Sequence, residues 1–216
     1  MNNRFDLLIF DWDGTLIDSI DWITHCLQTA AERCGCEVPE RQAAKNVIGL
    51  SIQKATSTLH PEVDAQTLEQ LVQHYSREYL SKKLSRNDLF PDVVEMLVEL
   101  KQAGYQLAVA TGKTRHGLQQ ALQSTETEDL FSVTRCADET ASKPEPKMLL
   151  EIMQVTNCLP ERSLMIGDSI HDLQMATNAH ISSVAVYCGA HPKDTLQHYE
   201  PLLCLSHATE LLAYLR

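Results

Sequence analysis

The amino-acid sequence predicts an α/β protein with a central parallel sheet and an all-helical segment inserted after the first strand. Three observations predict this fold class. Short apolar runs without polar alternation recur along the chain, which is typical of strands covered on both faces of a parallel sheet. Stretches with helical spacing of apolar residues lie between these runs, as in repeated strand-helix units. From about residue 17 to about residue 86, the pattern is helical and contains no strand-like run.

The core elements follow from the same patterns. The predicted strands cover residues 7–10, 106–110, 163–166 and 183–187, with residues 131–134 as a weaker fifth candidate. Apolar stripes predict core helices within residues 93–100, 148–153 and 170–176. Right-handed crossovers through such helices make the sheet parallel. We therefore expect a Rossmann-like core of three layers, in which ligands collect at the carboxyl ends of the strands.

The helical insert is expected to form a small cap. Its apolar spacing predicts helices around residues 20–31 and 68–80, and Pro91 is expected in the first turn of the next core helix. The predicted domains are therefore a core of residues 1–16 and 87–216 and a cap segment of residues 17–86. Two neighbouring linkers would form a hinge, so the cap segment could close over the strand ends as a lid.

Composition restricts the classes of partner. The 216 residues are 44% hydrophobic and 22% charged, which suits a globular protein. A formal net charge of -11 opposes nucleic acid and anionic membranes, so neither is an expected partner. The 7 cysteines include Cys34 and Cys36, which lack further zinc-like ligands, and predict reduced thiols in a cytoplasmic protein. No signal peptide precedes the first strand, and no apolar run approaches the length of a membrane span, so we expect a soluble protein.

Polar residues cluster where the predicted strands end. Four short motifs should meet at one edge of the sheet, with the candidate residues Asp11, Asp13 and Gly14; Thr111 and Gly112; Lys143; and Asp168 and Asp172. Each has an ordinary structural explanation: the Asp-Gly pair as a turn, Thr111, Ser142 and Asp168 as helix N-caps, and Lys143 as a surface residue. These separate explanations do not account for the placement of all four motifs at the same edge of the sheet. That shared placement favours a functional site.

The clustered residues suit phosphoryl chemistry. A carboxylate can attack phosphorus to form an aspartyl-phosphate, which divides a difficult hydrolysis into two easier steps. Because an anion attacking a phosphate dianion is repelled, we expect Mg²⁺ to bridge Asp11, Asp168 and a phosphate oxygen, with Lys143 adding positive charge. Thr111 and the free amides after the strand ends would hold the remaining phosphate oxygens. Asp13 is placed to protonate the departing oxygen and later deprotonate water.

The four motifs together resemble those of the haloacid dehalogenase-like hydrolase superfamily, and the match covers nearly the whole chain. The resemblance implies that Asp11 is the nucleophile and that Asp13 is the acid-base, whose main-chain carbonyl also binds magnesium. It implies that Asp168 is a metal ligand and that Asp172 supports the metal site through water. It also places the chain in the subgroup with a small helical cap, where it is most similar to phosphoglycolate phosphatase-like proteins. Trp12 and the pair Gly112-Lys113 depart from the residues that are commoner in the superfamily. Neither departure changes a catalytic side chain, but Lys113 could alter the contacts with phosphate or substrate.

The expected function is a magnesium-dependent phosphatase for a small organic phosphate monoester of the phosphoglycolate or sugar-phosphate type. Gly14, Thr111, Gly112 and Lys143 are the expected phosphate-binding residues, and Asp11, Asp13, Asp168 and Asp172 the expected metal site. The partner would be a small phosphorylated metabolite, and the protein a monomer or homodimer. Candidate cap contacts lie near residues 49–51, with Lys54 one turn onward.

Other functions remain open at this point. A β-phosphoglucomutase-like enzyme would return the phosphoryl group to a sugar, although no clear basic cap motif supports this. A binding protein could retain the fold without turnover. Dehalogenase chemistry is disfavoured because it needs no magnesium, whereas Asp13 and Asp168 are both present. The spacing of Gly14 does not fit an EF-hand, and the residues before Gly112 do not fit a P-loop.

Overall fold

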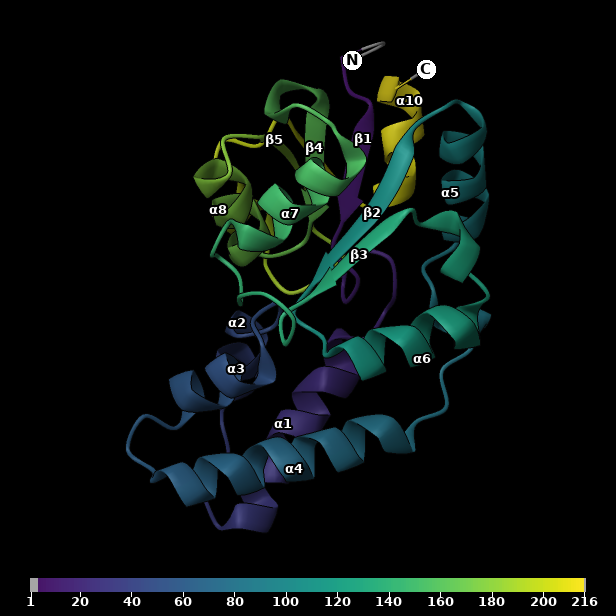
Figure 1. Cartoon of the computed structure of the whole chain (residues 1–216). Helices are drawn as coiled ribbons and strands as arrows, with labels where there is room; N and C mark the ends of the chain where they lie inside the picture. Colours follow the sequence, from purple (N-terminus) through teal and green to yellow (C-terminus); the bar gives the residue numbers. More distant parts are fainter. Residues whose placement is uncertain (1–3, 216) are drawn as a thin grey trace.

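The structure is a computed structural model that describes residues 4–215. In that range, one parallel sheet has the strand order β3-β2-β1-β4-β5-β6 (Figure 1). Its strands are β1 (Leu7–Phe10), β2 (Gln106–Thr111), β3 (Val133–Cys136), β4 (Ser163–Gly167), β5 (Ser182–Val186) and β6 (Leu203–Leu205). Leu7 of β1 lies opposite Gln106 of β2 and Ser163 of β4, so β1 has a neighbour on each side. The weaker candidate at 131–134 is a strand shifted by two residues, and β6 was missed because three residues carry too little pattern.

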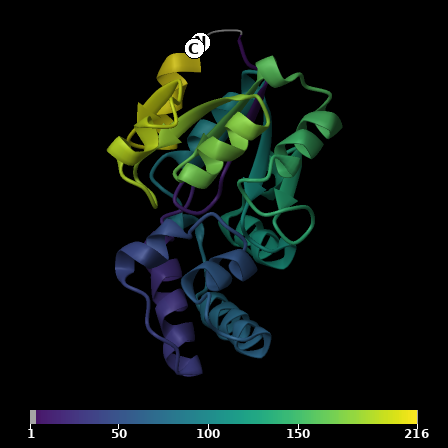
Figure 2. The same ribbon diagram turned by 90° about the vertical axis from the view of Figure 1, so that its left-hand side faces the viewer.

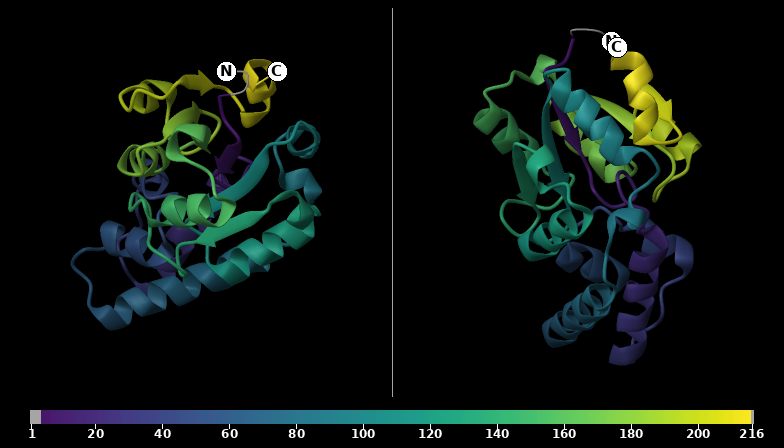
Figure 3. Two further views of the ribbon diagram at one scale, coloured as in Figure 1. Left: turned by 45° about the horizontal axis from the view of Figure 1, so that its top comes forward. Right: turned by 90° about the vertical axis from the view of Figure 1, so that its right-hand side faces the viewer.

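Helices cover both faces of the sheet and complete the predicted three layers (Figure 3). One face carries α5 (Val93–Gln102), α6 (Arg115–Thr125) and α10 (Leu212–Leu215). The other carries α7 (Lys147–Thr156), α8 (Ile170–Asn178) and α9 (Lys193–Gln197). The short 3₁₀ helices are η1 (Arg86–Asp88), η2 (Glu128–Leu130), η3 (Pro160–Arg162) and η4 (Ala208–Leu211).

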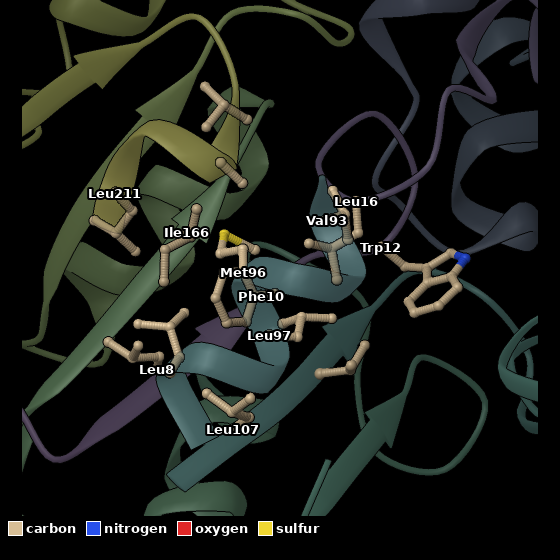
Figure 4. Packing of buried hydrophobic residues seen from close by; sticks show 14 of the residues in the cluster. Leu8, Phe10, Trp12, Leu16, Val93, Met96, Leu97, Leu107, Ile166 and Leu211 are labelled. Carbon is tan, nitrogen blue, oxygen red and sulfur yellow. The ribbon is translucent and has the colours of Figure 1, made fainter. Parts of the chain in front are cut away.

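The core is divided between the two faces by the two-residue period of the strands. Leu8 and Phe10 of β1 pack with Met96 and Leu97 of α5 on one face (Figure 4). Leu7 and Ile9 point to the other face, where α7 and α8 cover them. All four residues of β1 are buried, which explains why this strand shows no polar alternation.

Four α-helices follow β1 before the chain returns to the core at η1 and α5. They are α1 (Ile20–Cys34), α2 (Arg41–Asn46), α3 (Ile52–Leu59) and α4 (Ala65–Ser81). The long helices α1 and α4 pack along each other, and the group lies beyond the carboxyl ends of the strands (Figure 2). Gly35 ends α1 in the left-handed conformation at φ 67, and the Asp64 carboxylate accepts the Thr67 amide at the start of α4.

The cysteines form no disulfide among the described residues. All seven are free thiols. Cys34 and Cys36 flank the end of α1 and pack against a small cluster formed by Ala30, Ala31 and Leu71, as expected of ordinary residues near a helix end. No helix in residues 4–215 is long and apolar enough to cross a membrane.

The two linkers to the helical segment lie side by side. The Phe90 amide donates to the Leu16 carbonyl at 3.0 Å, and the Asp18 amide donates to the Asp88 carbonyl at 2.9 Å. The expectation that Pro91 occupies the first turn of α5 is wrong. The chain turns at residues 91–92, with Asp92 at φ 62, and α5 begins at Val93. Because Asp92 has the left-handed conformation, it is the N-cap of α5 and not part of its first turn, so Pro91 lies before the helix.

Candidate active site

A tight turn after β1 presents Asp11 and Asp13 at the end of the strand. The Trp12 carbonyl accepts the amides of Leu16 and Ile17, at 3.0 and 3.2 Å. Gly14 has φ 77, and a Cβ atom there would lie 2.3 Å from Oδ2 of Asp168. The glycine is therefore needed both for the turn and for the close approach of Asp168.

Lys143 joins two of the buried carboxylates. Its Nζ lies 2.7 Å from Oδ1 of Asp11 and 2.6 Å from Oδ1 of Asp172, and all three side chains are almost fully buried. Burial alone would lower the pKa of Lys143, but the carboxylates of Asp11 and Asp172 outweigh it and raise that pKa, so the ammonium stays protonated. The expectation that this lysine belongs to the site, and is not a surface residue, agrees with its position.

Asp172 supports the site from the first turn of α8. Its Oδ2 accepts the amide and the hydroxyl of Ser169, at 3.1 and 2.6 Å, while Oδ1 receives Lys143. Ser169 is the N-cap of α8, so the cap role that Asp168 might have had is filled by its neighbour. Oδ1 of Asp172 already contacts the Lys143 ammonium, a cation, which fits support of a metal site better than direct coordination.

Asp168 is held by two groups that the sequence did not single out. The Thr15 hydroxyl donates to Oδ1 at 2.9 Å, and the Ala190 amide donates to Oδ2 at 2.7 Å. Gly189 leaves room for the side chain, since a Cβ atom there would lie 2.0 Å from Oδ2 of Asp168. Thr15 could have been found from its place directly after the Asp-Gly turn, whereas Gly189 and Ala190 are far along the chain and carry no local signal.

The acidic cluster fits a divalent cation. Carboxylate oxygens of Asp11, Asp168 and Asp172 lie within 4.8 Å of one another. Oδ2 of Asp11 is buried and accepts no hydrogen bond from residues 4–215. The Asp13 carbonyl likewise accepts none from the described residues. These free oxygens, with the carboxylate of Asp168, are the hard ligands that Mg²⁺ prefers.

The pKa shifts of the clustered carboxyl groups also favour a bound cation. Burial raises the pKa of Asp11 well above its usual range, Lys143 opposes that rise, and the charges of Asp172 and Asp168 add to it. Burial, with the charge of Asp172, raises the pKa of Asp168 to about 7. Three carboxylates share one ammonium, so an added cation would favour their ionised forms.

Asp13 lies at the boundary between the sheet and the helical segment. Its Oδ1 accepts the Ser19 hydroxyl at 2.7 Å, and its Oδ2 lies 2.9 Å from Nζ of Lys113. The same ammonium contacts the hydroxyl of Tyr79 on α4 and lies 4.2 Å from the centre of its ring. Lys113 therefore links the expected acid-base to the cap segment, a contact that sequence spacing could not reveal.

Thr111 and Gly112 line the pocket beside Asp11 and Asp13. Thr111 is buried, and its hydroxyl accepts the Lys113 amide at 3.3 Å; the N-cap of α6 is Thr114 instead. A Cβ atom on Gly112 would lie 2.4 Å from the carbonyl oxygen of Leu50, so this glycine admits the backbone of the cap segment. The eight predicted site residues are thus gathered at the carboxyl edge of the sheet.

The loop between α2 and α3 docks the helical segment onto this edge. The Ser51 amide donates to the Ser142 hydroxyl at 2.8 Å, so Ser142 holds this loop and is not a helix cap. On the other side of the loop, the His171 ring lies 2.9 Å from the Asn46 carbonyl. Gly49 and Leu50 line the pocket beside Asp11 and Asp13, as expected, whereas Lys54 is exposed and is not among the described lining residues.

Comparisons with known proteins agree with this geometry. The family model described as haloacid dehalogenase-like hydrolase matches residues 8–186. "Probable phosphatase IndB" of Dickeya dadantii is 32% identical over 95% of this chain and 91% of its own. "Phosphoglycolate phosphatase" of Psychrobacter arcticus is 28% identical over 97% of this chain and 95% of its own. A solved haloacid dehalogenase-like hydrolase of Bacteroides fragilis has a TM-score of 0.87 and 29% identity, covering 96% of this chain and all of that one.

Proposed function

Because the chain belongs to the haloacid dehalogenase-like hydrolases and is a phosphatase of that family, we propose that it is a magnesium-dependent hydrolase of a small organic phosphate monoester. One observation carries the proposal. Asp11 has one oxygen 2.7 Å from Lys143 and another that is free of donors among the described residues, and it lies in the same pocket as Asp13. A nucleophile and an acid-base thus line one pocket.

The residues divide the reaction into two steps. Asp11 attacks phosphorus while the bond to the ester oxygen breaks, and Asp13 gives its proton to the departing oxygen. Asp13 then takes a proton from water as the water attacks the aspartyl-phosphate, which releases inorganic phosphate and restores Asp11. Lys143 and the main-chain amides after the strands hold the phosphate oxygens. Magnesium, held by Asp11, Asp168 and the Asp13 carbonyl with Asp172 in support, would supply charge neutralisation.

The helical segment is proposed to act as a cap domain of residues 17–86 on a core of residues 1–16 and 87–216. Its loop at 46–51 and Tyr79 already contact residues of the site. Closure would exclude bulk water during formation of the aspartyl-phosphate. We propose a cytoplasmic enzyme whose ligand is a small phosphorylated metabolite, and the screen should compare 2-phosphoglycolate and sugar phosphates with esters of other organic parts.

Hydrolysis is favoured over transfer to a phosphorylated sugar. Among the described pocket-lining residues, the helical segment contributes no lysine or arginine that would hold a second phosphate. A mutase would convert β-glucose 1-phosphate to glucose 6-phosphate when primed with a bisphosphate, instead of releasing phosphate. That product distinguishes the two reactions.

The nucleophile is tested by Asp11→Asn. We expect phosphate release to fall by at least about 1000-fold, because an amide is a poor nucleophile. Mass spectrometry of rapidly quenched wild-type protein should find one phosphoryl group on the peptide that contains Asp11. Asp129→Asn, which changes an exposed carboxylate on η2, is the matched control and should retain full activity. Full activity of Asp11→Asn would refute the covalent route.

A further inference from the structure

The wall of the pocket that faces Asp11 and Asp13 is apolar. It is formed by the helical segment, with side chains from α1, the loop after α2, α3 and α4. Its main members are Ile23, Leu27, Ile48, Ile52, Tyr75 and Tyr79. The rings of Tyr75 and Tyr79 are stacked, with centres 5.8 Å apart and planes at 21°. The phosphate-binding edge therefore faces hydrocarbon and aromatic side chains, several of which also pack in the core of the helical segment.

The wall carries no available positive charge. Lys113 is the only lysine or arginine among the described lining residues, and its ammonium already contacts the Asp13 carboxylate and the Tyr79 hydroxyl. The described lining residues also include the polar side chains of Tyr75, Ser76 and His116, which are fewer than the apolar side chains of the wall. A substrate carboxylate on this side would lose water without gaining a free lysine or arginine partner, and a polyol would find too few polar groups for all of its hydroxyls. An apolar group would instead gain from leaving water.

The apolar wall extends beyond what packing of the helical segment requires. Leu80 at the end of α4 lines the pocket although it is 44% exposed, and it belongs to none of the buried core clusters of the described residues. Hydrophobic surface that lines a catalytic pocket and remains in contact with solvent is typical of a ligand site. Its continuity with Asp11 and Asp13 identifies the occupant as the organic part of the substrate.

Resting on the phosphatase function proposed above, we infer that the preferred substrates are phosphate monoesters with an apolar or aromatic organic part. The apolar wall binds that part, and the phosphate binds at Asp11, Thr111 and Lys143. Compounds with a carboxylate or several hydroxyl groups in the same place, such as 2-phosphoglycolate and glucose 6-phosphate, are disfavoured.

The first test compares esters of primary alcohols, so that the chemistry of the departing oxygen is similar. Benzyl phosphate, n-butyl phosphate, 2-phosphoglycolate and glucose 6-phosphate are assayed for phosphate release with Mg²⁺. We expect kcat/KM for benzyl phosphate to exceed that for 2-phosphoglycolate by at least about tenfold, the usual size of discrimination by a pocket contact. An active enzyme that prefers 2-phosphoglycolate or glucose 6-phosphate, or that does not discriminate, overturns the inference.

A pair of exposed leucines provides the variant and its control. Leu80→Lys places a cation at the apolar wall, and we expect it to lower the ratio of benzyl phosphate to 2-phosphoglycolate kcat/KM by about 5- to 20-fold. Leu150 on α7 is 48% exposed and is not among the described lining residues, so Leu150→Lys should leave that ratio unchanged. An equal ratio in both variants would mean that the wall does not contact the substrate.

A binding measurement separates the inference from the proposed function. Benzylphosphonate and phosphonoacetate cannot be hydrolysed, and calorimetry with wild-type protein in Mg²⁺ compares their affinities. Tighter binding of benzylphosphonate by about tenfold supports the apolar site even if no ester is hydrolysed, in which case only the proposed function fails. Equal or weaker binding of benzylphosphonate refutes the apolar site, whatever the activity.

Discussion

Gly189 shows how much the site depends on single residues outside the catalytic motifs. A Cβ atom at this position would lie 2.0 Å from Oδ2 of Asp168 and 2.5 Å from its Cβ, so Gly189→Ala must displace the carboxylate. We expect phosphatase activity to fall about 10- to 100-fold and the Mg²⁺ concentration for half-maximal activity to rise, as when support of a metal ligand is lost. Both are measured by titrating Mg²⁺ in the phosphate-release assay.

Gly35 gives the control for this substitution. It has φ 67 but no atom within 4 Å of the added Cβ, and it lies at the far end of α1. Gly35→Ala should therefore reduce stability through backbone strain and leave the Mg²⁺ requirement unchanged. A Gly189→Ala protein with the wild-type Mg²⁺ requirement would show that Asp168 tolerates the methyl group.

The sequence predicts the residues that stand in compact motifs and misses those that act from elsewhere. Asp11, Asp13 and Asp168 could be placed because strand ends of a parallel sheet share one edge. Ser169 takes the N-cap of α8, which frees Asp168 for the site, and local pattern alone does not decide between two adjacent capping residues. The contact of Lys113 with Tyr79 joins residues 34 positions apart, so it requires the packed structure.

At the scale of elements, η1 fixes the point where the chain returns from the helical segment. The Asp88 carboxylate accepts the Ser85 amide at 2.9 Å and lies 2.8 Å from the Lys82 ammonium. Burial alone would raise the pKa of Asp88, but the hydrogen bonds from Lys82 and Ser85 outweigh it and lower that pKa. Ionised Asp88 thus stabilises the return linker beside residues 16–18.

We expect Asp88→Asn to lower the free energy of unfolding by about 0.5–1 kcal/mol at pH 7, a value limited by the partial exposure of the ion pair. Because the folded-state pKa is the lower one, this stability is present above the unfolded-state pKa of about 3.9 and is lost as the pH falls through the folded-state pKa. Urea unfolding at pH 7 and near pH 3.5 should show a difference from wild type that shrinks in acid. A difference that grows in acid would contradict the assigned sign.

Element prediction succeeded where the apolar pattern was clear, as on β1 and the core helices, and missed several short elements with little pattern. The stripes on α5, α7 and α8 correspond to the expected core helices. The helices α2 and α3 have six and eight residues, too few for a clear 3.6-residue period, and β6 has three. Their positions follow from packing against longer neighbours.

On the scale of the whole molecule, the parallel sheet determines where the site forms, and we propose that the helical segment determines which substrate the site accepts. The three layers follow from the alternation of apolar runs and helical stripes. The docking of the 46–51 loop on Ser142 and His171 could not be predicted, because it joins segments about 90 and 125 residues apart. The pocket beside Asp11 is lined from both sides of that contact, and for this reason motifs predict the reaction better than the substrate.

The same architecture predicts that magnesium stabilises the fold as well as the reaction. The carboxylates of Asp11, Asp168 and Asp172 lie within 4.8 Å only when β1 and β4 are paired, so the folded chain should bind Mg²⁺ far better than the unfolded chain. At a concentration about ten times the Kd, the free energy gained is about 1.4 kcal/mol, which corresponds to a rise in Tm of roughly 3–6 °C for a chain of this size. Thermal unfolding in 10 mM MgCl₂ is compared with EDTA at matched ionic strength. Asp168→Asn should lose the rise and Asp129→Asn should retain it; an equal rise in both variants would place the stabilising ion elsewhere.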